Sequence, residues 1–264
     1  KHIRLPINWE RLQPGVNGPL DSDYLQLIED LADAARTRQM FLLLDVHNSG
    51  RRTEGVIGSP AVPVTALADL WLRVAEHFAD HTGIEGYDLM NEPHHISEAT
   101  WVTAAQAAIL AIRTEDDTKK IYVEGANWAS SWNFESTNPT LHTLKDPKDK
   151  LVFSAHCYLD RDNSGSHFIW ADEVAAGSSS PVGAAMNEDI GLVRLASFAN
   201  WLEKHGFQGH IGEIGTGHEN PAWLTALDRA LNFAREKKLE VHYWAGGPRW
   251  GDYGYSVESG VSGQ

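Results

Sequence analysis

Short runs of β-branched and aliphatic residues alternate along this chain with longer stretches whose apolar residues recur at helical spacing. Strands that alternate with amphipathic helices are typical of βα units, which build a parallel sheet covered by helices. The apolar runs predict seven strands, over residues 3–8, 41–47, 86–91, 121–125, 151–158, 210–215 and 240–245.

The stretches between these strands predict helices, because their apolar residues follow the i, i+3, i+4, i+7 spacing of one buried face. The predicted stripes are Tyr24, Leu27, Ile28 and Leu31; Leu67, Leu70, Trp71, Val74 and Phe78; Trp101, Ala105, Ala108, Ile109 and Ile112; Ile190, Val193, Ser197, Phe198, Trp201 and Leu202; and Leu224, Leu227 and Leu231. Trp223 and the tryptophans within these stripes are therefore predicted to belong to the core. Residues 171–187 are predicted to form a long polar loop.

Length and composition fit one α/β domain. The chain has 264 residues, of which 42% are hydrophobic and 22% charged, and α/β barrels commonly need about 250 residues. We therefore predict a single catalytic domain over residues 1–264. The one cysteine, Cys157, excludes an internal disulfide.

The charge balance narrows the classes of partner. A formal net charge of −14 repels phosphate backbones and anionic lipid, so we expect neither a nucleic-acid nor a membrane partner. No run approaches the roughly 18 apolar residues that span a bilayer. A neutral glycan remains compatible with this charge.

Polar and aromatic residues collect where the predicted strands end. In a (β/α)8 TIM barrel all strands end at one rim, where the active site lies, so these residues would converge on one pocket. They are Arg4, Asn8-Trp9, Asp45, His47-Asn48, Asn91-Glu92-Pro93, Asn127-Trp128, His156, Tyr158, Glu213 and Trp244.

Two carboxylates in such a pocket suit the cleavage of a glycosidic bond, because one gives a proton to the leaving oxygen while the other attacks the anomeric carbon. Glu92 and Glu213 are the candidates. Arg4 is predicted to keep Glu213 ionised, and that charge would in turn keep Glu92 protonated. Tyr158 can donate a hydrogen bond to Glu213. Asn91 can bind the sugar 2-hydroxyl, and Trp244 offers a flat apolar face to the sugar ring.

The strand ends also resemble glycoside hydrolase family 5, the cellulase-containing family of clan A barrels, from Lys1 nearly to the C-terminus and in the family's order. The segments that carry the resemblance are Ile3-Arg4-Leu5-Pro6, Asp45-Val46-His47-Asn48, Leu89-Met90-Asn91-Glu92-Pro93-His94, His156-Cys157-Tyr158-Leu159-Asp160, Gly212-Glu213-Ile214-Gly215 and Tyr243-Trp244-Ala245.

The resemblance implies a retaining endo-β-1,4-glucanase without cofactor or metal, secreted and acting on β-glucan as a monomer. Glu92 would be the acid/base and Glu213 the nucleophile, with their carboxyl groups about 5–5.5 Å apart. The resemblance places six further residues around the sugar that is cleaved: Arg4, His47, Asn91, His156, Tyr158 and Trp244.

This chain departs from the family pattern at two places where the subgroup usually has an aromatic residue, which are occupied by Ser49 and Arg52. This puts a stacking platform at the glycone end in doubt. Cys157 stands where glutamine is common. Four tryptophans near strand ends predict aromatic walls of an open cleft: Trp9, Trp128, Trp132 and Trp250.

The family alignment begins at the second barrel strand, and residues 246–264 show turn-like sequence without a helical stripe. We therefore expect a barrel that lacks its first strand, first helix and last helix, in a longer natural enzyme with a secretion signal upstream.

Other functions remain open from the sequence. A metal-dependent hydrolase could use the 13 histidines, although His94 and His95 are adjacent and are predicted to point apart. A barrel that binds glycans without turnover is a second alternative. Mannan, xylan and xyloglucan remain alternative substrates.

Overall fold

The computed structural model describes residues 1–258 of the chain, which divide into two compact units. The first unit contains Lys1–Ala129 and Thr137–Ser154. The second contains Ser130–Ser136 and the chain from Ala155 onward. One strand, β7 (Leu151–Tyr158), carries the chain from the first unit into the second.

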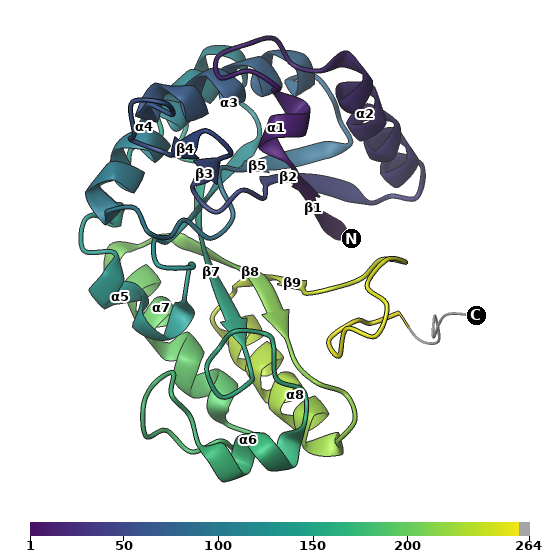
Figure 1. Ribbon diagram of the computed structural model, residues 1–264, viewed down its shortest axis with the longest axis vertical. Helices are drawn as coiled ribbons and strands as arrows, with labels where there is room; N and C mark the ends of the chain where they lie inside the picture. Colours follow the sequence, from purple (N-terminus) through teal and green to yellow (C-terminus); the bar gives the residue numbers. More distant parts are fainter. Residues whose placement is uncertain (259–264) are drawn as a thin grey trace. The chain divides into compact units, whose positions relative to one another are not determined.

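The first unit is a parallel sheet with the strand order β1-β2-β5-β6-β7. Its other strands are β1 (His2–Ile7), β2 (Phe41–Val46), β5 (Ile84–Asp88) and β6 (Lys120–Glu124). Its α-helices are α1 (Trp9–Leu12), α2 (Ser22–Thr37), α3 (Val64–Phe78) and α4 (Glu98–Glu115). A small antiparallel hairpin pairs β3 (Arg51–Arg52) with β4 (Gly55–Val56), and η2 (Leu141–Thr143) is a short 3-10 helix. Figure 1 shows α2, α3 and α4 outside these strands.

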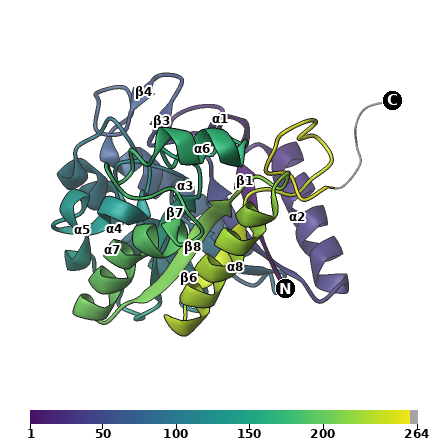
Figure 2. The same ribbon diagram turned by 90° about the horizontal axis from the view of Figure 1, so that it is seen from below.

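The second unit continues with the strand order β7-β8-β9. Its strands β8 (Gln208–Gly215) and β9 (Glu240–Tyr243) are accompanied by α7 (Ile190–His205) and α8 (Pro221–Glu236), which Figure 2 shows alongside β8. The shorter helices are η1 (Ser131–Asn133), α5 (Phe134–Thr137) and α6 (Trp170–Ala176).

Local chemistry explains where the main helices of the first unit begin. The side chain of Asp21 accepts a hydrogen bond from the Tyr24 N–H at the start of α2, and Ser97 does the same for Thr100 in α4. The strand register then brings the site residues together. Pro6 pairs with Asp45, and Asp45 pairs with Asp88, so β1, β2 and β5 end at one edge of the sheet.

The seven predicted strands and the five predicted long helices are confirmed. Trp71, Trp101, Trp201 and Trp223 are all buried, as expected for core residues. Each indole adds apolar contact area between its helix and the rest of its unit. The helical spacing predicted this burial.

Three of the predicted buried stripes are wrong in part. In α2, Leu27 and Leu31 are 53% and 51% exposed, in α7 Val193 is 46% exposed, and in α8 Leu224 and Leu231 are 54% and 38% exposed. The buried faces of α2 and α8 instead carry small side chains: Ala32 and Ala35 of α2, and Ala226, Ala230 and Ala234 of α8. Alanine lets a helix approach its neighbours closely, which turns the leucines outward.

The polar loop predicted over residues 171–187 is also wrong in part, because it begins with α6. This helix is fixed through Glu173, whose buried carboxylate accepts a hydrogen bond from Arg161 Nη1 at 2.9 Å. It ends at Ala176 and is followed by Gly177, where φ is +73°, a conformation that favours glycine.

The last part of the described chain, residues 246–258, forms turns and contains no helix or strand. Residues 259–264, the rest of the segment predicted to lack a helix, lie outside the described residues. Among the helices of residues 1–258, none combines the length and apolar character that a bilayer crossing requires.

Candidate active site

Arg4 is the centre of a buried ionic network in the first unit. Its Nε lies 2.8 Å from Asp88 Oδ2, and its Nη2 lies 2.7 Å from Glu124 Oε1 and 3.1 Å from Asp45 Oδ1. All four side chains are buried, and three carboxyl groups therefore share one guanidinium. Parallel strands make this arrangement possible, because β1, β2, β5 and β6 each contribute one of the four residues.

Asp88, one of the carboxyl groups that contact Arg4, has an unusual pKa. Burial raises the pKa of Asp88 well above its ordinary value, and the charges of Glu124 and Asp45 add to this effect while Arg4 opposes it. Asp88 Oδ1 is also buried without a hydrogen-bond partner. A protonated Asp88 relieves the excess of negative charge in the network.

Arg4 also fixes the orientation of Asn91, since its Nη2 donates to Asn91 Oδ1 at 2.9 Å. Because the guanidinium can only donate, the oxygen of the amide must face Arg4. The Nδ2 donor of Asn91 is thereby directed to the other side, where it can serve a hydroxyl acceptor.

Glu92 follows Asn91 in a left-handed backbone conformation with φ of +43°. Its backbone N–H donates to Glu124 Oε2 at 2.6 Å, and its carbonyl oxygen lies 2.9 Å from His94 Nδ1. The Glu92 side chain is partly exposed. Nearby, the partly exposed His47 places Nδ1 at 2.7 Å from Asp45 Oδ2, which joins it to the Arg4 network.

Trp128 is an exposed aromatic residue of this unit, with 42% of its surface accessible. His94 stacks on it with ring centroids 4.6 Å apart, and His95 meets it edge-on at 5.3 Å. The prediction that the two histidines point apart is wrong, because their rings lie 4.8 Å from each other. Both rings contact the indole of Trp128, whose apolar surface they could not both reach if they pointed apart.

In the second unit, Glu213 is buried near the end of β8 and accepts a hydrogen bond from the Tyr158 hydroxyl. The predicted contact between these two residues is therefore present. His156 Nδ1 lies 3.6 Å from the same carboxylate oxygen. Tyr158 is held in place by Gly165, where φ is +74° and a Cβ would lie 3.0 Å from the tyrosine ring.

Trp244 comes directly after β9 and is partly exposed. Trp250 meets it edge-on at 5.1 Å and donates from Nε1 to the Gly246 carbonyl at 3.0 Å. The two indoles thus form one aromatic pair. Trp132 lies in η1 and is partly exposed.

Trp9 does not belong to the predicted aromatic walls, because it is fully buried. Its Nε1 donates to Gln13 Oε1 at 3.1 Å, and the Arg52 guanidinium lies 5.2 Å from its ring centroid. Arg52 itself is buried and donates to the Gln13 carbonyl at 2.9 Å. Arg52 therefore connects the Trp9 ring with the backbone at Gln13 and Pro14.

One group in the second unit could offer ligands to a cation, since atoms of Asp160, Asp162 and His167 lie within 4.8 Å of one another. Oxygen and nitrogen atoms of these three residues already form hydrogen bonds within the loop 160–167. Asp160 Oδ2 accepts from the N–H groups of Ser166 at 2.9 Å and His167 at 3.1 Å. His167 Nε2 lies 3.1 Å from Asp162 Oδ2. These hydrogen bonds stabilise the loop, and the proximity of the three residues needs no cation to explain it.

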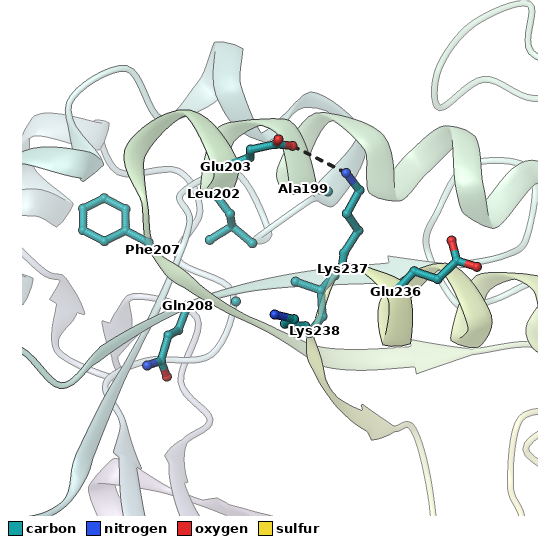
Figure 3. Close-up of a pocket in the computed structure, with 10 residues that line it drawn as sticks. Ala199, Leu202, Glu203, Phe207, Gln208, Glu236, Lys237 and Lys238 are labelled. Carbon is teal, nitrogen blue, oxygen red and sulfur yellow. Dashed lines mark hydrogen bonds and ion pairs between the residues drawn. The ribbon is translucent and has the colours of Figure 1, made fainter.

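A pocket of about 390 Å³ lies where β8 begins, lined by Leu202, Phe207, Gln208 and Leu239. Figure 3 shows Leu202, Phe207 and Gln208 together with an ion pair between Glu203 and Lys237. Since Glu213 is near the other end of β8, this pocket is not where that carboxylate acts.

Glu124 and Asp88 were not predicted as site residues, because they lie within predicted strands and were taken as part of the apolar runs. An acidic residue inside a buried strand was the signal, because such a group needs a charged partner. Glu92 and Glu213 belong to different units. Their separation, and the predicted effect of Arg4 on Glu213, stay predictions.

Comparison with known proteins places these residues in context. The model of the family Cellulase (glycosyl hydrolase family 5) matches residues 1–249. Endoglucanase 3 of Humicola insolens is 33% identical over 97% of this chain, which spans 62% of that protein's length. Endo-beta-1,4-glucanase B of Emericella nidulans is 32% identical over 97% of this chain and is covered to 73%.

The solved structure of Pseudomonas stutzeri endoglucanase Cel5A in complex with cellobiose has a similar fold, with a TM-score of 0.89 and 36% sequence identity. The similarity covers 99% of this chain and 76% of that one. It confirms the predicted fold class, the (β/α)8 TIM barrel.

Proposed function

Because the chain belongs to glycosyl hydrolase family 5, we propose that it is a retaining endo-β-1,4-glucanase, a cellulase that cleaves β-glucan by double displacement. The names of the relatives support this substrate class, as does the cellobiose bound to the P. stutzeri enzyme. A polysaccharide substrate also suits a chain with a formal net charge of −14, because a neutral glycan is not repelled.

The contact between Tyr158 and Glu213 carries the proposal. A nucleophile must present its carboxylate in a fixed direction, and the Tyr158 hydroxyl holds one oxygen of the buried Glu213. Glu213 would attack the anomeric carbon and expel the leaving sugar. His156 adds a second polar neighbour at 3.6 Å.

Glu92 is proposed as the acid/base that protonates the leaving oxygen and then activates water for the second step. Its partly exposed side chain and the anchoring of its backbone by Glu124 support this role. Asn91, with its amide donor oriented by Arg4, would bind the 2-hydroxyl of the cleaved sugar. His47, which contacts Asp45, is proposed to bind the same sugar.

The aromatic residues are proposed as sugar platforms, because pyranose rings stack on flat apolar faces. Trp128 is supported by its exposure, and Trp244 by its place directly after β9. Trp132 and Trp250 are proposed as further contacts, with Trp250 also supporting Trp244. We propose further that the enzyme acts outside the cell, as a monomer and as a single catalytic domain.

The test is a panel of β-1,4-glucan, mannan, xylan and xyloglucan with detection of new reducing ends. The proposal expects the highest kcat/KM on the glucan and initial release of the β-anomer in proton NMR. A higher kcat/KM on another polysaccharide would show that β-1,4-glucan is not the preferred substrate. Initial release of the α-anomer would exclude a retaining mechanism. Absence of turnover on all four would favour a glycan-binding barrel, while loss of activity with a chelator would favour a metal-dependent hydrolase.

Two variants separate the roles of the glutamates. Glu213→Gln should abolish turnover on every substrate. Glu92→Gln should lose far less on aryl glycosides with good leaving groups, because those need no proton to depart. Equal losses of Glu92→Gln on both substrate types would contradict the assignment.

A further inference from the structure

His94 connects the candidate acid/base with the exposed tryptophan, and we propose that it is a positioning residue for the leaving-group side of the cleavage reaction. It would fix the backbone of Glu92 and, with the same ring, support Trp128 as the platform for the sugar that departs. The inference rests on the proposed glycosidase function and adds a residue to it.

The stack on Trp128 is the first observation. The two rings are nearly parallel, with an interplanar angle of 12° and centroids 4.6 Å apart. Trp128 is held by an unusual backbone, because Asn127, Trp128 and Ala129 all have positive φ, of 59°, 58° and 52°. Its N–H donates to the Pro93 carbonyl at 3.3 Å, so Trp128 is tied to the segment that follows Glu92.

The second observation is the contact of His94 Nδ1 with the Glu92 carbonyl oxygen at 2.9 Å. A carbonyl oxygen can only accept, so Nδ1 must carry a proton and donate. Burial lowers the pKa of His94, and the positive charge of nearby Arg51 acts in the same direction, while the contact with Glu92 opposes them. A neutral imidazole with its proton on Nδ1 satisfies both observations.

The main chain of His94 is fixed as well, because Arg51 Nη2 donates to its carbonyl oxygen at 3.1 Å. His94 is therefore held at its carbonyl while its ring holds both Glu92 and Trp128. A proton donor must lie within hydrogen-bond reach of the leaving oxygen. A single rigid side chain between donor and platform would set the distance between the Glu92 carboxyl group and a sugar stacked on Trp128.

His95 provides a matched control, since it is adjacent in sequence and also touches Trp128. Its contact is edge-on at 5.3 Å and its side chain is exposed. An edge contact from a solvent-exposed ring should restrict the indole far less than a parallel stack does.

Two substitutions separate the two contacts of His94. His94→Asn keeps a side-chain N–H donor and removes the stack, whereas His94→Phe keeps the stack and removes the donor. Each variant is assayed for kcat and KM on cellotetraose, which has sugars on the leaving side, and on an aryl cellobioside, which has none there. Circular dichroism follows the thermal unfolding of each variant, and His94→Gln and His94→Tyr repeat both tests with other side chains.

We expect His94→Asn to raise KM about fivefold on cellotetraose and to leave KM on the aryl cellobioside unchanged. His94→Phe should keep KM on both and lower kcat about tenfold on cellotetraose, with a smaller loss on the activated substrate. His95→Ala should match the wild type throughout.

The inference is overturned if both His94 variants behave as the wild type does, or if they lose activity equally on both substrates. Failure of the proposed function gives a different result, because the wild-type protein would then not cleave cellotetraose at all.

Discussion

Glu124 accepts a hydrogen bond from the backbone N–H of Glu92 through Oε2 at 2.6 Å, while its Oε1 lies 2.7 Å from Arg4 Nη2. One buried carboxylate thus connects the ionic network to the backbone of the candidate acid/base. Glu92 has a φ of +43°, a region that residues other than glycine enter only when their surroundings hold them there. Glu124 supplies part of that restraint.

The substitution Glu124→Gln tests this relationship. A glutamine has one oxygen and one NH2 group where the glutamate has two acceptors, so it must present a donor either to Arg4 or to the Glu92 N–H. We expect kcat to fall about tenfold or more because Glu92 is misplaced, with a smaller change in KM.

Asp146→Asn is the matched control, because Asp146 is a buried carboxylate that accepts from both Nε and Nη2 of Arg113, at 2.8 and 2.9 Å. It should lower the free energy of unfolding without changing kcat. If Glu124→Gln keeps the kcat of the wild type, Glu124 does not position Glu92.

Arg4 should be intolerant even of lysine. Replacing the guanidinium by an ammonium group removes the fixed set of donors that serves Asp88, Glu124 and Asn91 together. We expect Arg4→Lys to lower the free energy of unfolding by about 3–5 kcal/mol in urea titrations, because it leaves buried carboxylates incompletely paired.

Arg73→Lys is the control for Arg4. Arg73 pairs with Asp69 at 2.9 Å on the surface of α3, and an exposed pair contributes about 1 kcal/mol or less. If Arg4→Lys and Arg73→Lys lower the free energy of unfolding by similar amounts, burial is not the reason why Arg4 matters for stability.

Much of the fold could be predicted because buried residues recur at regular spacing in the sequence. The strands and the stripes of α3 and α4 follow this spacing, and the stripe of α7 follows it except at Val193, which is exposed. The exposed Leu27 and Leu224 could not be predicted, because the choice between a leucine face and an alanine face depends on how closely the neighbouring element approaches. The spacing of residues in the sequence does not determine the distance between a helix and its neighbour.

The candidate site was predicted in part for a similar reason. Polar residues at strand ends, such as Asn91 and His156, differ from the apolar residues before them and are conspicuous. Asp88 and Glu124 lie inside the strands, and their role depends on Arg4 from another strand. Trp9 was misassigned because a tryptophan near a strand end can face either the cleft or the core.

Gly215 is predicted to be essential for the position of Trp244. A Cβ at Gly215 would lie 2.7 Å from the Trp244 carbonyl oxygen and 2.7 Å from the Tyr255 ring, closer than real Cβ contacts allow. We expect Gly215→Ala to lower kcat/KM about tenfold or more through displaced site residues. Gly246→Ala is the control, because its Cβ would meet only Val257 at an ordinary 3.4 Å. Equal activity of the two variants would show that the site tolerates the displacement.

Asp88 should make stability depend on pH in the direction opposite to most carboxylates. Since burial raises its pKa well above the ordinary value, the folded protein holds a proton that the unfolded chain releases above about pH 4. The folded state therefore binds more protons, and the free energy of unfolding falls as pH rises from about 4 through the pKa of folded Asp88.

Asp88→Asn tests this sign, because asparagine mimics the protonated acid and can still accept from Arg4 through its oxygen. In urea titrations between about pH 5 and 8, the variant should lose the decline in stability, which can reach about 1 kcal/mol per pH unit in the wild type. Asp146 has a lowered pKa, since its hydrogen bonds with Arg113 and the Lys148 and Lys150 N–H groups outweigh burial. Its contribution is lost only at lower pH, so Asp146→Asn should lower stability by the same amount across this range. A wild-type slope retained in Asp88→Asn would show that Asp88 is ionised in the folded protein.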